Sequence, residues 1–285
     1  CNKVGGIYTV LSSRAQTLLK EYGDKLIFLG PDIWQEKNNP DFLEDKKLLT
    51  NWREAAAKEG VNVRIGRWQV AGRPVAVLVD FQPFFEQRNS IYGTAWQNFG
   101  VQSDKAYGDY DEASMFSYAA ARFVEIIYLS LIHKNEKVVY QAHEWMAGLG
   151  MLHLRKAAPS IATIFTTHAT SIGRSITSNN KQLYKYFHGY NGDQMAEELH
   201  MDAKHSVEKK SAHFADCFTT VSTFTNKECV QLLEKPADVI LPNGFDNAIV
   251  PKGSIFTTKR KAARKNLLRV ASALLGEELS DKIMI

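Results

Sequence analysis

Short apolar runs rich in β-branched residues alternate along this chain with longer segments of helical period. The first of these segments is helical because apolar side chains recur every three or four positions from Ile7 to Leu19, and Gly23 follows as a helix-ending residue. Helices are predicted over residues 7–21, 48–58, 112–133 and 257–274. Strands are predicted over residues 26–29, 61–70, 75–81, 138–142, 162–167, 218–221 and 238–241.

This alternation predicts an α/β fold with a Rossmann-like parallel sheet flanked by helices. Residues 71–74 indicate a hairpin between two of the strands. The stretch from Gln82 to Tyr110 has no clear period, so we expect a long loop there, of the kind that is often functional. Because ligands of parallel sheets bind beyond the carboxyl ends of the strands, the residues that follow each strand are the candidates for chemistry.

Composition and charge narrow the function classes. The 285 residues are 45% apolar and 23% charged, as in ordinary globular proteins, and no apolar run reaches the ~18 residues of a membrane span. The net charge of +4 is too small to indicate nucleic acid, and the basic run at 259–265 is the solvated side of a predicted amphipathic helix. Three cysteines without a Cys-x-x-Cys pair predict neither a zinc site nor a disulfide framework, and favour a cytoplasmic protein.

Two glycines open the first predicted helix. In Lys3-Val-Gly-Gly-Ile7, Gly5 and Gly6 allow backbone N–H groups to approach a phosphate at the positive end of the helix, and Lys3 adds charge. A tight turn before the helix explains the same residues equally well. The segment matches neither a Walker loop nor a Gly-x-Gly-x-x-Gly fingerprint.

A histidine and a glutamate follow the strand predicted at 138–142. His143 and Glu144 are not a zinc-protease motif, because Ala147 stands where that motif has its second histidine. They form either a polar pair that faces a ligand or a cap, in which Glu144 accepts hydrogen bonds from the first N–H groups of the next helix. From these two residues alone the cap is the better-supported interpretation.

The strand predicted at 162–167 is followed by His168 and, six residues further, Arg174. An imidazole and a guanidinium in this arrangement can surround one ligand, and arginine suits a phosphate or a cluster of sugar hydroxyls. The alternative is a structural histidine beside a solvated arginine. The position at a strand end, shared with the two preceding motifs, weighs against that alternative.

Asn243 lies in Leu241-Pro-Asn-Gly244, directly after the last predicted strand. Pro-Asn-Gly is typical of a turn, and a turn is the simplest interpretation. Because this turn separates the main αβ series from the C-terminal segment, it also occupies the place of a hinge between two domains.

Five motifs taken together resemble those of glycogen synthases of the animal and fungal type and of their bacterial relatives. Each motif is weak alone, but their order and spacing match along nearly the whole chain, which makes the resemblance specific. The motifs are Lys3-Val-Gly-Gly-Ile-Tyr-Thr-Val10, His143-Glu-Trp-Met-Ala-Gly148, Thr163-Ile-Phe-Thr-Thr-His-Ala-Thr170 with Arg174, Phe218-Thr-Thr-Val-Ser222 and Leu241-Pro-Asn-Gly244.

The resemblance implies the N-terminal half of a GT-B glycosyltransferase, in which two Rossmann-like domains enclose the active site. Such enzymes transfer glucose from UDP-glucose to the non-reducing end of an α-1,4-glucan such as glycogen, with retention of configuration. It implies catalytic roles for His168, Arg174 and Glu144, and donor-binding roles for Lys3, Gly5, Gly6, His143 and Asn243. Neither a metal nor another cofactor is implied, because lysine, arginine and helix N-termini neutralise the diphosphate.

The predicted organisation is an N-terminal glycosyltransferase domain at residues 1–246, followed at 247–285 by a linker helix and the start of a C-terminal domain. The chain begins at Cys1 and ends on the apolar stretch at 282–285. The resemblance implies that the family's Glu-x7-Glu pair belongs to the C-terminal domain, outside these residues. We therefore expect an excised domain, inactive alone. Its expected partners are UDP-glucose, glycogen, the C-terminal domain of the parent chain and, in a homo-oligomer, further copies.

Other functions remain open at this point. ADP-glucose is an alternative donor, as in bacterial and plant starch synthases, although the Lys3–Tyr8 and Thr166–Thr170 motifs favour the UDP type. A non-catalytic glucan-binding protein is a second alternative. A nicotinamide-binding domain is the weakest, since no glycine fingerprint follows any predicted strand.

Overall fold

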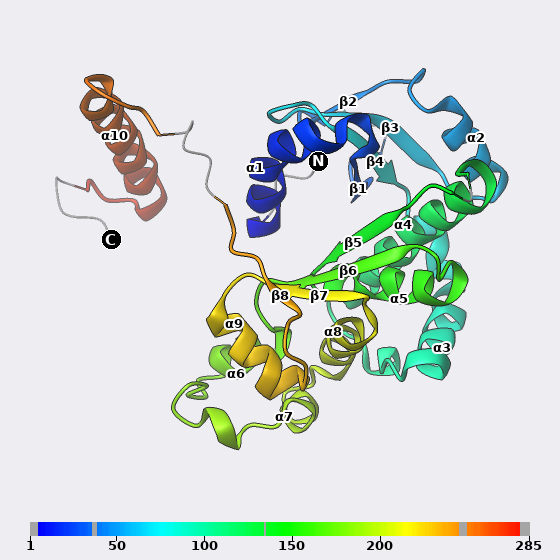
Figure 1. Cartoon of the computed structure of the whole chain (residues 1–285). Helices are drawn as coiled ribbons and strands as arrows, with labels where there is room; N and C mark the ends of the chain where they lie inside the picture. Colours follow the sequence, from blue (N-terminus) through cyan, green and yellow to red (C-terminus); the bar gives the residue numbers. More distant parts are fainter. Residues whose placement is uncertain (1–4, 36–38, 134, 245–249, 280–285) are drawn as a thin grey trace. The chain divides into compact units, whose positions relative to one another are not determined.

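The computed structural model describes residues 5–35, 39–133, 135–244 and 250–279 (Figure 1). The chain forms two compact units, residues 1–243 and 244–285. The predicted boundary at residue 246, the start of a strand expected at 283–285, and Lys3 lie outside the described residues. The assignment of residues 247–285 to a linker and a further domain stays a prediction.

The described residues of the first unit form two sheets, where the sequence predicted one parallel sheet. The first sheet has the strand order β1-β4-β3-β2 and is mixed, because β1 pairs parallel with β4 while β3 pairs antiparallel with both β4 and β2. The predicted hairpin is confirmed, and it explains the difference: a turn of a few residues, with Gly72 at φ +87°, cannot carry a parallel crossover. The strands are β1 (Ile27–Pro31), β2 (Phe42–Glu44), β3 (Val63–Trp68) and β4 (Val75–Val79).

The second sheet is the parallel sheet that the sequence predicts. Its strands follow one another in chain order, and the pairing places His143, the last residue of β5, opposite Thr166 in β6. The carboxyl ends of neighbouring strands therefore meet at one edge of this sheet (Figure 1). The strands are β5 (Val139–His143), β6 (Ala162–Thr167), β7 (Cys217–Thr220) and β8 (Val239–Ile240).

Ten α-helices occur in the described ranges, and the four that the sequence predicts are among them. They are α1 (Gly5–Tyr22), α2 (Thr50–Lys58), α3 (Arg88–Phe99), α4 (Tyr110–Leu131), α5 (Gly148–Ala157), α6 (Ser171–Ser178), α7 (Gly192–Glu198), α8 (Asp202–Phe214), α9 (Thr223–Glu228) and α10 (Ile255–Leu275). A π-helical turn, Cys229–Leu233, continues α9. Short 3-10 turns are η1 (Gly23–Lys25), η2 (Gln82–Gln87), η3 (Ser103–Lys105), η4 (Trp145–Ala147) and η5 (Phe187–Gly189).

The prediction of a long loop between Gln82 and Tyr110 is wrong. The turn η2 and the helix α3 occupy most of that stretch. The apolar residues of α3 stand at positions 91, 92, 95, 96 and 99, a helical spacing that is short and is obscured by the glycine and polar residues between them; of these side chains only Ile91, Tyr92 and Ala95 are buried, and Trp96 is exposed. The buried face of α3 is set by contact with α5.

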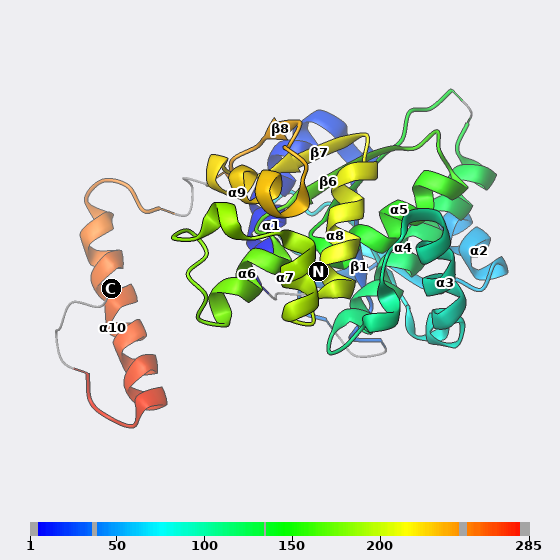
Figure 2. The same ribbon diagram turned by 90° about the horizontal axis from the view of Figure 1, so that it is seen from below.

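The main core lies between the parallel sheet and the helices that cover it. Helices α5 and α8 pack against β6, and α4 lies beside α5 (Figures 1 and 2). Phe165 in β6 and Phe218 in β7 are fully buried, with their rings stacked at a centroid distance of 6.0 Å. This packing fixes the strands whose carboxyl ends carry the candidate residues.

The second unit is described by α10, which confirms the predicted basic helix at 257–274. None of the residues of α10 is buried. Among all helices in the described part of the chain, none combines the length and apolar composition that crossing a bilayer requires.

Candidate functional site

Two histidines meet at the carboxyl edge of the parallel sheet. His143 ends β5, and His168 follows β6 directly, so the parallel pairing of the two strands brings their side chains together. The Nδ1 atom of His143 lies 3.1 Å from the Nε2 atom of His168. One hydrogen bond therefore joins the rings, and it requires that one nitrogen donates and the other accepts.

Both imidazoles are held in the neutral form near pH 7. Burial lowers the pKa of His143 to about 3, and the neighbouring His168 and Arg14 act in the same direction. Burial also lowers the pKa of His168, assisted by the positive charges of Arg14 and Arg174. A neutral pair of this kind can donate and accept hydrogen bonds without placing a charge in the site.

Glu144 holds the loop that carries His168. Its Oε1 atom accepts a hydrogen bond from the backbone N–H of His168 at 3.0 Å, and its own N–H donates to the carbonyl of Thr166 at 2.8 Å. The carboxylate makes no capping bond to the helical turn that follows, so the cap interpretation of Glu144 is wrong. Its side chain reaches across to the neighbouring strand end instead.

The backbone of Glu144 is strained. Its φ of +64° with ψ of 167° is a conformation that glycine favours and other residues rarely adopt, at a cost of about 1–3 kcal/mol. Glu144 is 4% exposed, and burial raises the pKa of its carboxyl group, while Arg174 and the N–H groups of His168 and Ala169 oppose that rise. Strain and burial of a carboxyl group at a strand end are frequent at functional sites.

Arg174 lies at the open side of this cluster. Its Nη2 atom is 3.9 Å from Oε1 of Glu144, and two thirds of its side chain is exposed. A pair this long and this exposed binds weakly, so most of the hydrogen-bonding capacity of the guanidinium faces solvent. The structure thus brings together four predicted residues, His143, Glu144, His168 and Arg174.

Asn243 joins the cluster through a residue that the sequence did not single out. Arg14 in α1 donates from Nη2 to Oδ1 of Asn243 at 3.2 Å, and its charge acts on both His143 and His168. In the sequence Arg14 is one polar position among others in an amphipathic helix. Only its proximity to the two strand ends distinguishes it.

The glycines of the first motif open helix α1, as predicted. Gly5 has a φ of +71°, and a Cβ atom built on Gly5 or Gly6 would meet no atom within 4 Å. The conformation explains why glycine stands at position 5, and the space beside the loop is open. The donor-binding role of Gly5, Gly6 and Lys3 stays a prediction.

Within the described ranges, no group of three or more His, Cys, Asp or Glu side chains could hold a metal ion, and this includes the surroundings of His143 and His168. Of the cysteines in those ranges, Cys229 is buried and Cys217 is partly buried, and burial raises the pKa of both thiols. The chemistry available at the sheet edge is that of neutral imidazoles, two arginines and a buried carboxyl group.

A parallel sheet covered by helices, with a polar cluster beyond the carboxyl ends of its strands, defines a Rossmann-like α/β domain of the kind that forms the N-terminal half of GT-B glycosyltransferases. The sequence model of the family described as Glycogen synthase matches residues 1–255. The chain belongs to the glycogen synthase family.

Relatives from animals and fungi agree with this assignment. The liver glycogen [starch] synthase of Homo sapiens is 33% identical over 250 residues, and glycogen [starch] synthase isoform 2 of Saccharomyces cerevisiae is 32% identical over 257 residues. The glycogen [starch] synthase of Neurospora crassa is 31% identical over 252 residues. Each alignment covers 86% of this chain but 35–36% of the relative, so the chain spans about a third of the length of these proteins.

Proposed function

We propose that this chain provides one side of the active site of a retaining glucosyltransferase, which transfers glucose from UDP-glucose to the non-reducing end of an α-1,4-glucan. Membership of the glycogen synthase family supports this proposal. The observation that carries it is the cluster at the carboxyl edge of β5 and β6, where His143 and His168 share a hydrogen bond beside Glu144 and Arg174.

The neutral state of the two imidazoles suits this reaction. As the bond between glucose and the diphosphate breaks, positive charge develops at the anomeric carbon, and a protonated histidine beside that carbon would repel it. The lowered pKa of His168 avoids this repulsion, so the imidazole can orient a sugar hydroxyl by a hydrogen bond. We assign His168 to the transferred glucose, with Glu144 fixing its position and shaping the sugar side.

The departing nucleoside diphosphate requires positive charge. The exposed guanidinium of Arg174 can supply it, and Lys3 with the N–H groups of the Gly5-Gly6 helix start is proposed to bind the donor phosphates. His143 and Asn243 complete the proposed donor side. These groups supply the compensating charge and hydrogen bonds themselves, so the proposed reaction needs neither a metal nor a cofactor.

The test is glucosyl transfer to glycogen by the full-length gene product and its His168→Ala variant. Removing a preorganised hydrogen-bond donor from such a site costs on the order of 10²–10³ in kcat, so a fall of this size is expected. His133→Ala, which removes an exposed histidine outside the cluster, is the matched control and should retain full activity. Unchanged transfer by His168→Ala would refute the assignment.

Donor and acceptor are tested in the same assay. UDP-glucose is expected to be used in preference to ADP-glucose, and the reverse preference would identify the alternative donor. Binding of glycogen without transfer from either donor would identify a non-catalytic glucan-binding protein. Further parts of the proposal are a cytoplasmic location, a C-terminal domain as partner and assembly into a homo-oligomer.

Residues 1–285 alone are proposed to be inactive, because the matched part of the relatives is only about a third of their length. Robust transfer by residues 1–285 in isolation would refute this part of the proposal and leave the rest standing.

A further inference from the structure

A buried glutamate on α8 contacts the loop that carries His168. Glu208 is fully buried, and its two carboxyl oxygens are used separately. Oε1 accepts a hydrogen bond from the hydroxyl of Thr167 at 3.2 Å, and Oε2 accepts one from the backbone N–H of Ser171 at 2.8 Å. These partners stand one residue before and three residues after His168, so one side chain spans the whole turn between β6 and α6.

Two other carboxylates hold the same turn from different elements. Glu144, at the end of β5, accepts from the N–H of His168 itself. Glu228, in α9, accepts from the hydroxyl of Thr170 at 2.7 Å, and the same hydroxyl caps α6 by accepting from the N–H of residue 173. The turn is therefore bound at four of its five positions, 167, 168, 170 and 171, by carboxyl groups that come from three separate parts of the fold.

The burial of Glu208 is costly, and its position explains how the cost is reduced. Burial raises the pKa of Glu208 to about 8, the negative charge of Glu144 acts in the same direction, and the hydrogen bonds from Ser171 and Thr167 oppose both. With this pKa the carboxyl group is mostly protonated near pH 7, so it avoids most of the cost of a buried charge and still accepts the hydrogen bond from the Ser171 N–H. A hydrophobic residue would fill this volume without desolvation cost, but it would leave the Ser171 N–H without an acceptor.

We propose that Glu208 is a positioning residue for the active site: it fixes the turn at 167–171, so that the imidazole of His168 keeps its place beside His143. The hydrogen bonds of Glu208 go to the Ser171 backbone and the Thr167 hydroxyl, so it acts on His168 through the turn. The expected effect on kcat rests on the proposed function. The structural part of the proposal, a turn held by Glu208, is measurable without any reaction.

The experiment combines hydrogen–deuterium exchange with kinetics on the full-length gene product. Glu208→Ala removes both acceptors, so exchange of the amides at 167–171 should rise at least tenfold. Displacement of a catalytic group by about 1 Å costs on the order of 100-fold, so kcat should fall about 10- to 100-fold while KM for UDP-glucose changes less than threefold. Glu208→Gln keeps an acceptor for Ser171 and a hydrogen-bond partner for Thr167, and should restore both quantities to within about threefold of the wild type.

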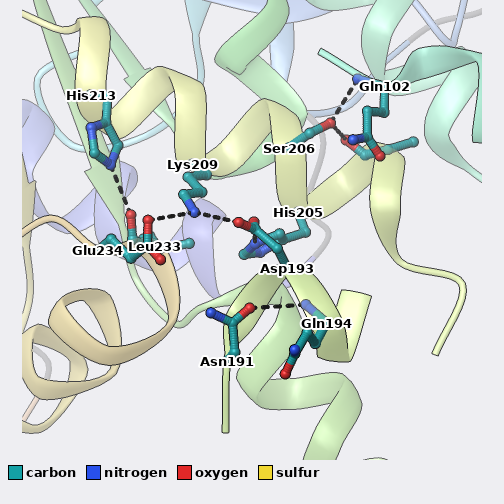
Figure 3. A network of polar contacts seen from close by, with 11 residues as sticks. Gln102, Asn191, Asp193, Gln194, His205, Ser206, Lys209, His213, Leu233 and Glu234 are labelled. Atoms are coloured by element: carbon teal, nitrogen blue, oxygen red, sulfur yellow. Dashed lines mark hydrogen bonds and ion pairs between the residues drawn. The ribbon is translucent and has the colours of Figure 1, made fainter. Parts of the chain in front are cut away.

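The neighbouring residue on the same helix provides the matched control. Lys209 forms ion pairs with Asp193 and Glu234 at 2.8 Å each, away from the turn at 167–171 (Figure 3). His205 contacts Asp193 in the same network at 2.9 Å. Lys209→Met should therefore lower the melting temperature and leave both the exchange at 167–171 and kcat unchanged.

Each outcome decides the proposal. Unchanged exchange at 167–171 in Glu208→Ala, or an equal rise in Lys209→Met, would overturn it, as would a loosened turn with undiminished kcat. If Glu208→Ala does not fold, Thr167→Val provides the test, because it removes the hydrogen bond between the Thr167 hydroxyl and Glu208 and keeps the one from Ser171. It should raise exchange at the turn by a smaller factor, and no rise would overturn the proposal. Absence of transfer by the wild type would refute the proposed function alone, because the exchange measurement would still show whether Glu208 holds the turn.

Discussion

The close contact between α4 and α5 gives the sharpest prediction of stability. Gly150 in α5 lies against Ser117 in α4, and a Cβ atom built on Gly150 would come within 2.0 Å of the Ser117 carbonyl oxygen. The backbone N–H of Gly150 also donates to the Ser117 hydroxyl at 2.7 Å in a buried position. Gly150→Ala must therefore push the two helices apart or break this hydrogen bond.

The net effect combines three contributions. Overpacking of this kind costs about 1–3 kcal/mol, and loss of the hydrogen bond costs about 0.5–1.5 kcal/mol. Alanine gains about 1 kcal/mol over glycine within a helix, which offsets part of the loss. We expect the free energy of unfolding to fall by about 2 kcal/mol in Gly150→Ala.

Gly93 in α3 is the matched control. It is exposed, and a Cβ atom built on it would meet no atom within 4 Å, so only the helical gain remains. Gly93→Ala should therefore stabilise the protein by about 0.5–1 kcal/mol. Urea denaturation followed by circular dichroism measures both changes, with an unchanged denaturant slope. If both variants gained stability equally, the close approach of α4 and α5 would be refuted.

Three further predictions concern the site and its support. Because folding lowers the pKa of His143 to about 3 from its usual 6.5, the stability it provides is complete above pH 6.5 and declines as pH falls to 3, by up to ~1.4 kcal/mol per pH unit. Denaturation at several pH values should show a shallower decline in His143→Asn, and an equal slope would contradict the assignment. Burial is the main cause of the lowered pKa of His168, and the charge of Arg14 is the second. Arg14→Ala should therefore raise the pKa of His168 in an NMR titration, and an unchanged pKa would exclude this influence. Asp216 accepts hydrogen bonds from the N–H and the hydroxyl of Thr163 at 2.8 and 2.9 Å. Asp216→Ala should therefore lower the free energy of unfolding by about 1–3 kcal/mol, and Asp216→Asn, which keeps an acceptor, by less. Similar losses of stability in thermal unfolding of the two variants would argue against these bonds.

The predictions from the sequence succeeded where local pattern decides structure. The helix at α1, the hairpin of β3 and β4 and the parallel strand β6 follow from periodicity and turn residues. The prediction of a loop at 82–110 failed because the apolar positions of α3 span only residues 91–99, with glycine and polar residues between them, and its helical state depends on packing against neighbouring elements. The division into two sheets was also missed, since pairing between distant strands leaves no mark on the sequence of either strand.

The candidate site shows the same division. Motifs indicated His143, Glu144, His168 and Arg174 because polar residues after buried strands are recognisable in sequence. No local pattern distinguishes Glu208, which lies in the middle of a helix 40 residues after His168 and differs in nothing obvious from a solvated glutamate.

The sequence by itself therefore determined the kinds of element, the family and the residues at the strand ends, because periodicity and motifs are properties of neighbouring positions. Only the tertiary structure decided which groups meet: the hydrogen bond between His143 and His168, the strained backbone of Glu144 that reaches the next strand, and the support from Glu208. The physical reason is that these contacts, their burial and the resulting pKa shifts arise from the parallel pairing of strands and the packing of helices over them, which join residues that are far apart along the chain.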